Sequence, residues 1–160
     1  MEPLTHTLCL ACGLCCNGVL FADVRPEPGD PSPLFAGRRR VAQPCPAFSA
    51  GDCTCAIYPD HPVRCRQFEC RQLLAVRAGE TTVPQALRKI RRARQLARKL
   101  DQGLSALGFD NPKLPLRRRF AQCQRAAEAG GLTAPALDRL AEVQLAMHQL
   151  TRLLAGDFFG

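Results

Sequence analysis

The sequence predicts a mainly α-helical protein in which an irregular, cysteine-rich N-terminal half with little strand packs on three to four C-terminal helices. Nine of the ten cysteines lie before residue 71, in a half that is also rich in proline. After residue 80, apolar residues recur at helical period, and glycines follow the periodic segments. We therefore expect a cysteine module over residues 1–80 and a helical extension over residues 81–160, packed together as one domain.

The first sixty residues offer few signals for regular structure. Residues 1–16 carry the first cysteines, and residues 19–24 are a short apolar run that we expect to form a small strand. Residues 25–36 contain four prolines. Because proline removes a backbone donor and is disfavoured inside helices, this segment is expected to be a loop. Residues 43–58 carry further cysteines and are also expected to be irregular.

A helix is expected over residues 60–78, with Asp60 as its cap and Gly79 directly after its end. It contains Cys65 and Cys70. Five residues at 100° each place these two side chains roughly 140° apart on a regular helix. The two thiols can share one site only if the helix is distorted or begins later, so we expect Cys65 to lie at a frayed start.

Three more helices are expected, over residues 83–102, 117–129 and 134–155, each ended by a glycine. The first begins with the spacing of a capping box, in which Gln85 follows Thr82 by three residues. Each of the two long helices has an apolar stripe at helical period. Such stripes more often form a core than a cofactor pocket, and we interpret them as core.

The cysteines form two sets with the spacing of metal ligands. In the first, Cys9-x2-Cys12-x2-Cys15-Cys16, overlapping C-x2-C pairs allow two thiolates from one turn to meet one ion. The second set consists of Cys45, Cys53, Cys55, Cys65 and Cys70. Packing alone does not explain such density, whereas the isolated Cys123 is expected to be an ordinary core residue.

This pattern resembles the YkgJ-like cysteine cluster family, a zinc- or iron-chelating domain with a CxxCxxCC signature. The resemblance covers roughly residues 9–70 and rests on the first set, on Cys45, and on the run Cys55-x-Ile57-Tyr58-x2-His61-Pro62-x2-Cys65-Arg66-x-Phe68-x-Cys70. His61 stands where the family usually has arginine, and Cys53 is an addition. The resemblance implies eight metal ligands: Cys9, Cys12, Cys15, Cys16, Cys45, Cys55, Cys65 and Cys70.

Spacing leaves the identity of the metal open. Two four-thiolate zinc sites would use all eight cysteines, whereas one iron–sulfur cubane would use four, with room for a zinc beside it. The adjacent Cys15 and Cys16 favour two sites or a cluster between them, and the family resemblance slightly favours an iron–sulfur cluster over zinc. Because ligation must close a long, proline-rich loop, we expect the metal-free N-terminal half to be poorly ordered.

The helix over residues 83–102 has a basic face that is a second candidate for binding. At 100° per residue, one half of the helical wheel holds Arg88, Arg91, Arg92, Arg94, Arg98 and Lys99, and Lys89 lies outside it. The five arginines are candidates for contact with nucleic acid or an acidic partner, while the alternative is a solvated or internally paired face. With one tyrosine and no tryptophan in the chain, base-stacking platforms are scarce, so nucleic acid is not the favoured partner.

Composition narrows the classes of function. The N-terminus lacks the basic start and apolar segment of a secretory signal, and no apolar run has the roughly 20 residues of a membrane span, so we expect a cytoplasmic protein. The net charge of +8 favours an anionic or acidic partner.

We expect a small metal-binding protein in redox chemistry or metal handling, with an unidentified protein or redox partner. The alternative is a zinc-stabilised interaction module, and no nucleophile, base or cofactor loop supports an enzyme.

Overall fold

The computed structural model describes residues 3–159, and these are mainly helical, as predicted. The helices are α1 (Pro3–Cys12), α2 (Val63–Gln67), α3 (Arg71–Arg77), α4 (Val83–Ala106), α5 (Leu116–Glu128) and α6 (Ala134–Asp157). Antiparallel pairs join β1 (Asp23–Val24) to β2 (Val41–Ala42) and β3 (Phe48–Ser49) to β4 (Thr54–Cys55), and a 3₁₀ turn, η1, covers Tyr58–Asp60. None of the helices in this described part combines the length and apolar character needed to cross a membrane.

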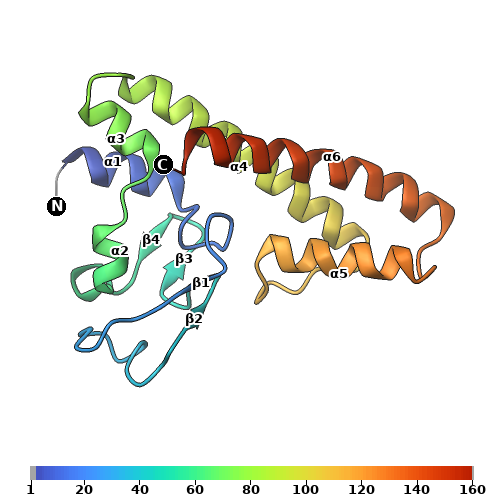
Figure 1. Cartoon of the computed structure of the whole chain (residues 1–160), viewed down its shortest axis with the longest axis horizontal. Coiled ribbons are helices and arrows are strands. Elements are labelled where there is room, and N and C mark those ends of the chain that lie inside the picture. Colours follow the sequence, from blue (N-terminus) through green and yellow to red (C-terminus); the bar gives the residue numbers. More distant parts are fainter. Residues whose placement is uncertain (1–2, 160) are drawn as a thin grey trace.

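The two longest helices, α4 and α6, lie side by side and form the backbone of the molecule (Figure 1). Helix α5 packs on α4 at one end of this pair, and α1 and α3 pack on α4 toward the other end. The small strands and α2 lie together beside that second end, so the cysteine-bearing segments gather on one side of the helical frame (Figure 1).

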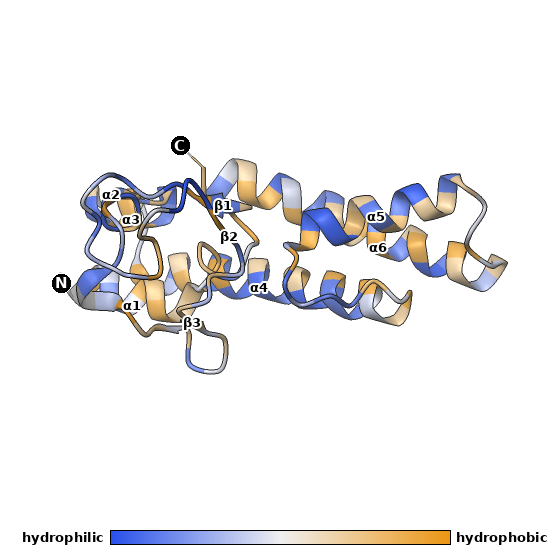
Figure 2. Ribbon diagram, turned by 90° about the horizontal axis from the view of Figure 1, so that it is seen from below, coloured by the Kyte–Doolittle hydropathy of each residue, from blue (hydrophilic) through white to orange (hydrophobic). Residues whose placement is uncertain are grey.

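The core joins the helical half to the cysteine-rich half. Apolar and polar residues alternate as bands along α4, α5 and α6 (Figure 2), as expected for helices that bury one face. The main buried positions of the two long helices are Ala86, Ile90, Ala93, Leu96, Leu100, Leu104, Leu140, Val143, Met147, Leu150 and Leu154. Leu8, Leu14 and Leu20, which flank the first cysteines, belong to the same apolar cluster. The cysteine-bearing loop is therefore anchored on the helices by a shared core.

Helix α4 begins as predicted but ends later. The capping box is present, because the Gln85 backbone N–H donates to Thr82 Oγ1 (3.4 Å) and the Thr82 N–H donates to Gln85 Oε1 (2.9 Å). The predicted end before Gly103 is wrong. A Cβ at Gly103 would lie 2.5 Å from Val143 Cγ2 of α6, so glycine is needed here for helix packing rather than for termination. The positive φ of 84° is found instead at Gly108.

The helix expected over residues 60–78 is divided into α2 and α3. Phe68 and Cys70 adopt extended backbone angles between the two pieces, which supplies the distortion that the spacing of Cys65 and Cys70 required. Asp60 does not cap α2. The backbone N–H of Val63 donates instead to Asp30 Oδ1 (2.9 Å), a residue of the proline-rich loop that is distant in sequence.

Two further elements differ from the sequence-based prediction. Helix α1 was not predicted, although Pro3 suits a first helical position and Leu4 and Leu8 are four residues apart. Helix α6 was expected to end at residue 155, directly before Gly156. It continues through Gly156 to Asp157, so the predicted end is wrong by two residues.

Arg119 of α5 fastens this helix to α4. Its side chain is only 4% exposed and donates to Asp101 Oδ1 (2.5 Å), to Ser105 Oγ (3.1 Å) and to the Phe109 carbonyl (2.6 Å). It therefore does not extend the basic surface, although it lies in a run of three arginines.

Candidate metal centre

The eight predicted ligands lie on three separate segments of the chain. The end of α1 and the turn after it carry Cys9, Cys12, Cys15 and Cys16. The second segment runs from Cys45 to the end of β4 at Cys55. The third is the pair of short helices α2 and α3 with the extended break between them. The site is thus built from loops and helix ends that rest on the frame of α4 and α6.

The first segment turns sharply at Gly13. Its backbone N–H closes the last turn of α1 on the Cys9 carbonyl (3.1 Å), and the Cys16 N–H donates to the Gly13 carbonyl (3.1 Å). Gly13 has a φ of 63°, and a Cβ here would lie 2.8 Å from Cζ of Phe48. Glycine is therefore required both for the left-handed turn and for the close approach of the second segment.

The second segment lies directly against this turn. The Cys45 backbone N–H donates to the Cys16 carbonyl (2.7 Å), which joins the two predicted ligand sets. Cys55 pairs across the β3–β4 hairpin with Phe48, whose ring packs on Gly13. Cys45 and Cys55 are thus held near Cys16 by backbone pairing and by one aromatic contact.

The third segment supplies one cysteine from each short helix. Cys65 lies inside α2, and Cys70 is the N-cap of α3. The proline-rich loop holds α2 in place through the Asp30 cap and through an ion pair between Glu27 and Arg64 (3.2 Å). The break in the helix at Phe68 separates Cys65 from Cys70, so that the two side chains can lie next to different groups of cysteines.

The eight thiols divide into two groups of four by the charges that act between them. The first group, named the α1 quartet here, consists of Cys9, Cys12, Cys15 and Cys70. The second group, the hairpin quartet, consists of Cys16, Cys45, Cys55 and Cys65. Within each group, a thiolate on one member raises the pKa of others. The two groups also act on each other, because Cys16 raises the pKa of Cys15 and Cys9 raises the pKa of Cys16.

Burial is the first cause of the raised thiol pKa values. It raises the pKa of Cys12 and that of Cys16 to about 12, with smaller contributions from neighbouring thiols. The pKa of Cys65 rises to about 11, again first through burial and then through Cys45, Cys55 and Asp30. Because burial disfavours the thiolate, a positive ion close to several of these thiols would stabilise their thiolate forms together.

The described arrangement brings the thiols near one another without closing a coordination sphere. Within residues 3–159, no three His, Cys, Asp or Glu side chains form a group that could already hold a metal ion. The donor chemistry nevertheless fits zinc or an iron–sulfur cluster, because both are bound by four soft thiolates. Two groups of four thiols match that requirement in number and in type.

Arg94 links the basic helix to the α1 quartet. Its guanidinium Nη1 donates to the carbonyl of Ala11 (2.6 Å), between Cys9 and Cys12, and its charge lowers the pKa of Cys12 against the larger effect of burial. The side chain is half-buried. Sequence analysis placed Arg94 with the partner-binding arginines, and nothing in the local sequence indicated this contact with the first segment.

The remaining predicted arginines of α4 are on the surface. Arg88, Arg91, Arg92 and Arg98 are all exposed. Lys89, which the wheel placed outside the basic face, pairs with Asp157 of α6 (2.6 Å). The structure therefore separates one arginine that contacts the cysteine-bearing turn from four that face solvent.

Cys53 and His61 lie at the edge of the site. Cys53 has a φ of 55°, and its Sγ would be 3.2 Å from a Cβ placed on Gly13, yet its charge is not among the causes that shift the two quartets. The His61 ring stacks on Tyr58 at a centroid distance of 4.7 Å, and its Nδ1 contacts the Tyr58 carbonyl. Burial, followed by Cys9 and Cys55, raises the pKa of Tyr58, which places this residue near both quartets.

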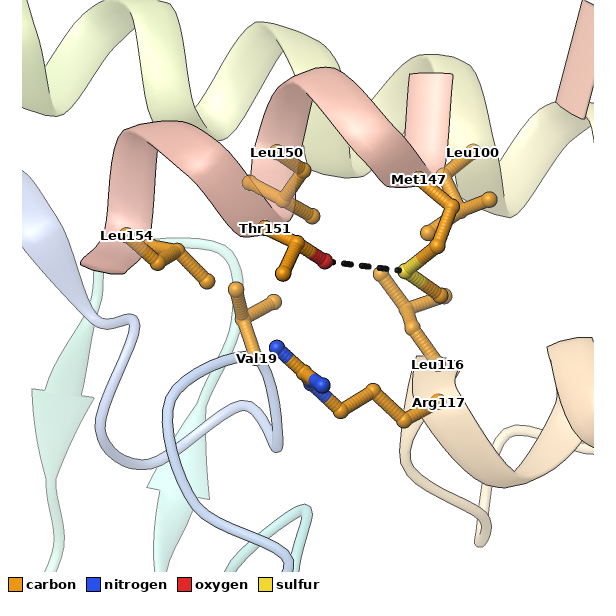
Figure 3. A pocket seen from close by; sticks show the side chains of 8 residues that line it. All are labelled: Val19, Leu100, Leu116, Arg117, Met147, Leu150, Thr151 and Leu154. Atoms are coloured by element: carbon orange, nitrogen blue, oxygen red, sulfur yellow. Dashed lines mark hydrogen bonds between the residues drawn. The ribbon is translucent and has the colours of Figure 1, made fainter. Parts of the chain in front are cut away.

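The hollow nearest the centre of the helical frame has no room for a substrate. It has a volume of about 10 Å³ and lies between α4, α5, α6 and Val19 (Figure 3). Apolar side chains line most of it, Arg117 reaches over it, and Thr151 Oγ1 contacts Met147 Sδ at 3.8 Å. Its volume corresponds to about one water molecule.

Comparisons of this chain with protein-family models, with curated proteins and with solved structures find no match.

Proposed function

We propose that this protein is a small metal-binding protein of the YkgJ-like type, which binds its metal through two neighbouring groups of four cysteines. One observation supports this proposal above all: cysteines that the sequence pattern selects from three separate segments lie close enough for their charges to act on one another, as Cys70 does on Cys12 and Cys65 does on Cys16. Cys123, which the pattern does not select, is buried on α5 as a core residue.

Bringing several thiols together at a buried place makes their ionisation less favourable. Desolvation and repulsion from neighbouring thiols raise the pKa of Cys12, Cys15, Cys16 and Cys65 and so favour their neutral forms. A thiolate-binding ion reverses this balance, because its charge stabilises all four thiolates of a group and releases their protons. A backbone hydrogen bond from Cys45 to Cys16 joins two of the separate segments that carry the ligands.

An iron–sulfur cluster is the favoured occupant of at least one quartet, and zinc is the alternative. When bound, a cluster would supply one-electron redox chemistry, whereas zinc would supply structure. Arg94 would then place a positive charge and a hydrogen-bond donor beside the α1 quartet, an effect that tunes the redox potential of such clusters. A reducing compartment such as the cytoplasm would keep the thiols free to bind metal.

Metal and acid-labile sulfide analysis after strictly anaerobic purification, with a visible spectrum, tests this proposal. Iron with matching sulfide and a bleachable brown chromophore would indicate a cluster, and stoichiometric zinc in a colourless protein would indicate a structural site. Protein that binds neither metal, also after reconstitution with iron and sulfide or with zinc, would overturn the proposal.

Paired serine variants test the division into quartets. Cys12→Ser with Cys70→Ser should abolish binding at the α1 quartet and leave the hairpin quartet loaded. Cys45→Ser with Cys55→Ser should have the converse effect. Cys53→Ser and Cys123→Ser are matched controls that should retain the full metal content. Equal loss from both ligand pairs and from the controls would contradict the assignment.

A further inference from the structure

The solvent-facing side of α4 carries an unusual concentration of positive charge. Seven exposed residues form this surface, named the α4 basic face: Arg88, Arg91, Arg92, Gln95, Arg98, Lys99 and Gln102. At 100° and 1.5 Å per residue they cover an arc of about 120° over a length of about 21 Å. Five of the seven are cations and none is acidic or apolar.

The fold itself does not neutralise this charge. Within residues 3–159, no carboxylate forms an ion pair with the five cations of the α4 basic face. The nearest basic neighbours on the helix behave differently, since Lys89 pairs with Asp157 and Arg94 donates to Ala11. Like charges three and four residues apart repel, so the packing of α4 gains nothing from this arrangement.

Four of the five charges are arranged in two rows, and Arg88 lies between them. Arg91 and Arg98 lie along one edge of the arc, and Arg92 and Lys99 lie along the other. Gln95 and Gln102 lie between the rows, where neutral amides add hydrogen-bonding groups without adding charge. At one end, Lys99 and Gln102 border a groove that also contains Asp138, Arg139 and Glu142 of α6.

The composition of the face indicates the class of partner. Protein–protein interfaces depend on buried aromatic and apolar anchors, and the α4 basic face has none. Interfaces with nucleic acid are polar and strongly positive, and arginine binds phosphate oxygens in bidentate fashion. Every phenylalanine and tyrosine in the described part of the chain is at least partly buried, so a platform for stacking single-stranded bases is missing there.

We propose that the α4 basic face binds the phosphate backbone of double-stranded nucleic acid. The contact is independent of base sequence, because four of its five cations lie along the edges of the face and phosphates are the partners within their reach. It does not depend on which metal, if any, the cysteines hold. Arg91, Arg92 and Arg98, which alternate between the two rows, are the residues whose loss should weaken the contact most.

The test is fluorescence anisotropy of the full-length protein with a labelled 24-base-pair duplex of mixed sequence, made once as DNA and once as RNA. The same strand without its complement and polyglutamate serve as competing probes. The test variant is Arg91→Gln with Arg92→Gln and Arg98→Gln. The control, Arg39→Gln with Arg125→Gln and Arg152→Gln, removes the same charge from exposed positions elsewhere. Circular dichroism confirms that both variants fold.

We expect the test variant to lose at least about tenfold in duplex affinity at 100 mM salt and the salt slope of log K to shrink by about 2–3. The control should stay within about twofold of the native protein. Binding to only one of the DNA and RNA duplexes would support the proposal and identify the source of the phosphates. Equal losses in test and control, tighter binding of the single strand or of polyglutamate, or no duplex binding at 50 mM salt would overturn it.

Discussion

Gly103 is a position at which close packing between two helices matters more than helix propensity. Gly103 lies inside α4, where glycine costs about 1 kcal/mol relative to alanine, yet Val143 of α6 occupies the space that a side chain would need. The crossing of the two long helices thus depends on a missing Cβ. Gly156, in α6, has nothing within 4 Å of its would-be Cβ and makes a natural comparison.

Substitution by alanine should lower the free energy of unfolding at Gly103 but not at Gly156. Gly103→Ala should lower the free energy of unfolding by about 1–3 kcal/mol, because its Cβ would push on Val143. Gly156→Ala should be neutral or stabilise by up to about 1 kcal/mol. Urea denaturation measures both. A Gly103→Ala variant as stable as the native protein would contradict the packing role of this glycine.

Arg119 should contribute more to the free energy of unfolding than its sequence neighbour Arg118. Arg119→Ala would leave the part-buried carbonyl of Phe109 without its donor and Asp101 without its ion partner, so a loss of about 1–3 kcal/mol is expected. Arg118→Ala, at an exposed position, should change the free energy of unfolding by less than about 0.5 kcal/mol. Similar losses in the two variants would indicate that the Arg119 contacts contribute little.

The buried thiol of Cys123 predicts a pH dependence of stability. Burial raises its pKa in the folded state above the ordinary value of 9.0. The stabilisation linked to this shift is therefore complete below about pH 9 and is lost as the pH rises through the folded-state pKa. The difference in unfolding free energy between native protein and Cys123→Ala should shrink between pH 8 and pH 11. A difference that stays constant over this range would refute the linkage.

At the scale of elements, the cysteine module is assembled by caps and pairings between segments that are distant in sequence. Asp30 of the proline-rich loop caps α2, and Cys45 pairs with the carbonyl of Cys16. These contacts explain how helices as short as α2 and α3 hold their positions, since helices of this length are not stable alone. They also explain why the module needs its long loop.

Removal of the α2 cap should loosen the hairpin quartet selectively. Asp30→Ala leaves the Val63 N–H without its acceptor, so α2 and its Cys65 should become more mobile. We expect faster release of metal from the hairpin quartet to a chelator, by at least about threefold if the cap is worth about 1 kcal/mol. Glu27→Ala, which removes only an exposed ion pair with Arg64, is the control. Unchanged release from Asp30→Ala would disprove a role for this cap.

At the scale of the whole molecule, two parts of different stability share one core. The frame of α4 and α6 is held by a continuous apolar interface, whereas residues 13–70 are held by short strands, turns and the proposed metal. Loss of metal should therefore disorder one part and spare the other.

Hydrogen exchange with and without metal measures this difference. On chelation, amide protection should fall across residues 13–70 and remain in the middle of α4 and α6. The far-UV helical signal should change little, because most helical residues lie in α4, α5 and α6. Uniform loss of protection along the whole chain would show instead that the metal holds the helical frame together.

Sequence reasoning was most successful where structure is local. The capping box of Thr82 and Gln85, the apolar stripes of α4 and α6 and the core position of Cys123 depend on side chains within a few residues of one another. Two of the helix ends that were predicted at glycines were wrong, because a glycine can end a helix or can lie inside it and let a second helix pack closely. Whether Gly103 terminates α4 or accommodates Val143 depends on α6, which lies about forty residues further along the chain.

The candidate site shows the same limit. The sequence by itself determined the C-x2-C spacing of the first cysteines, because ligand spacing within one turn is a local property, and the family resemblance implied which eight cysteines belong to the pattern. Only the tertiary structure decided that Cys70 joins the α1 quartet, that Cys65 joins the hairpin quartet and that Arg94 contacts the first segment. Those relations follow from the break between α2 and α3 and from the packing of α1 on α4. They arise from contacts between distant segments, which no local pattern encodes.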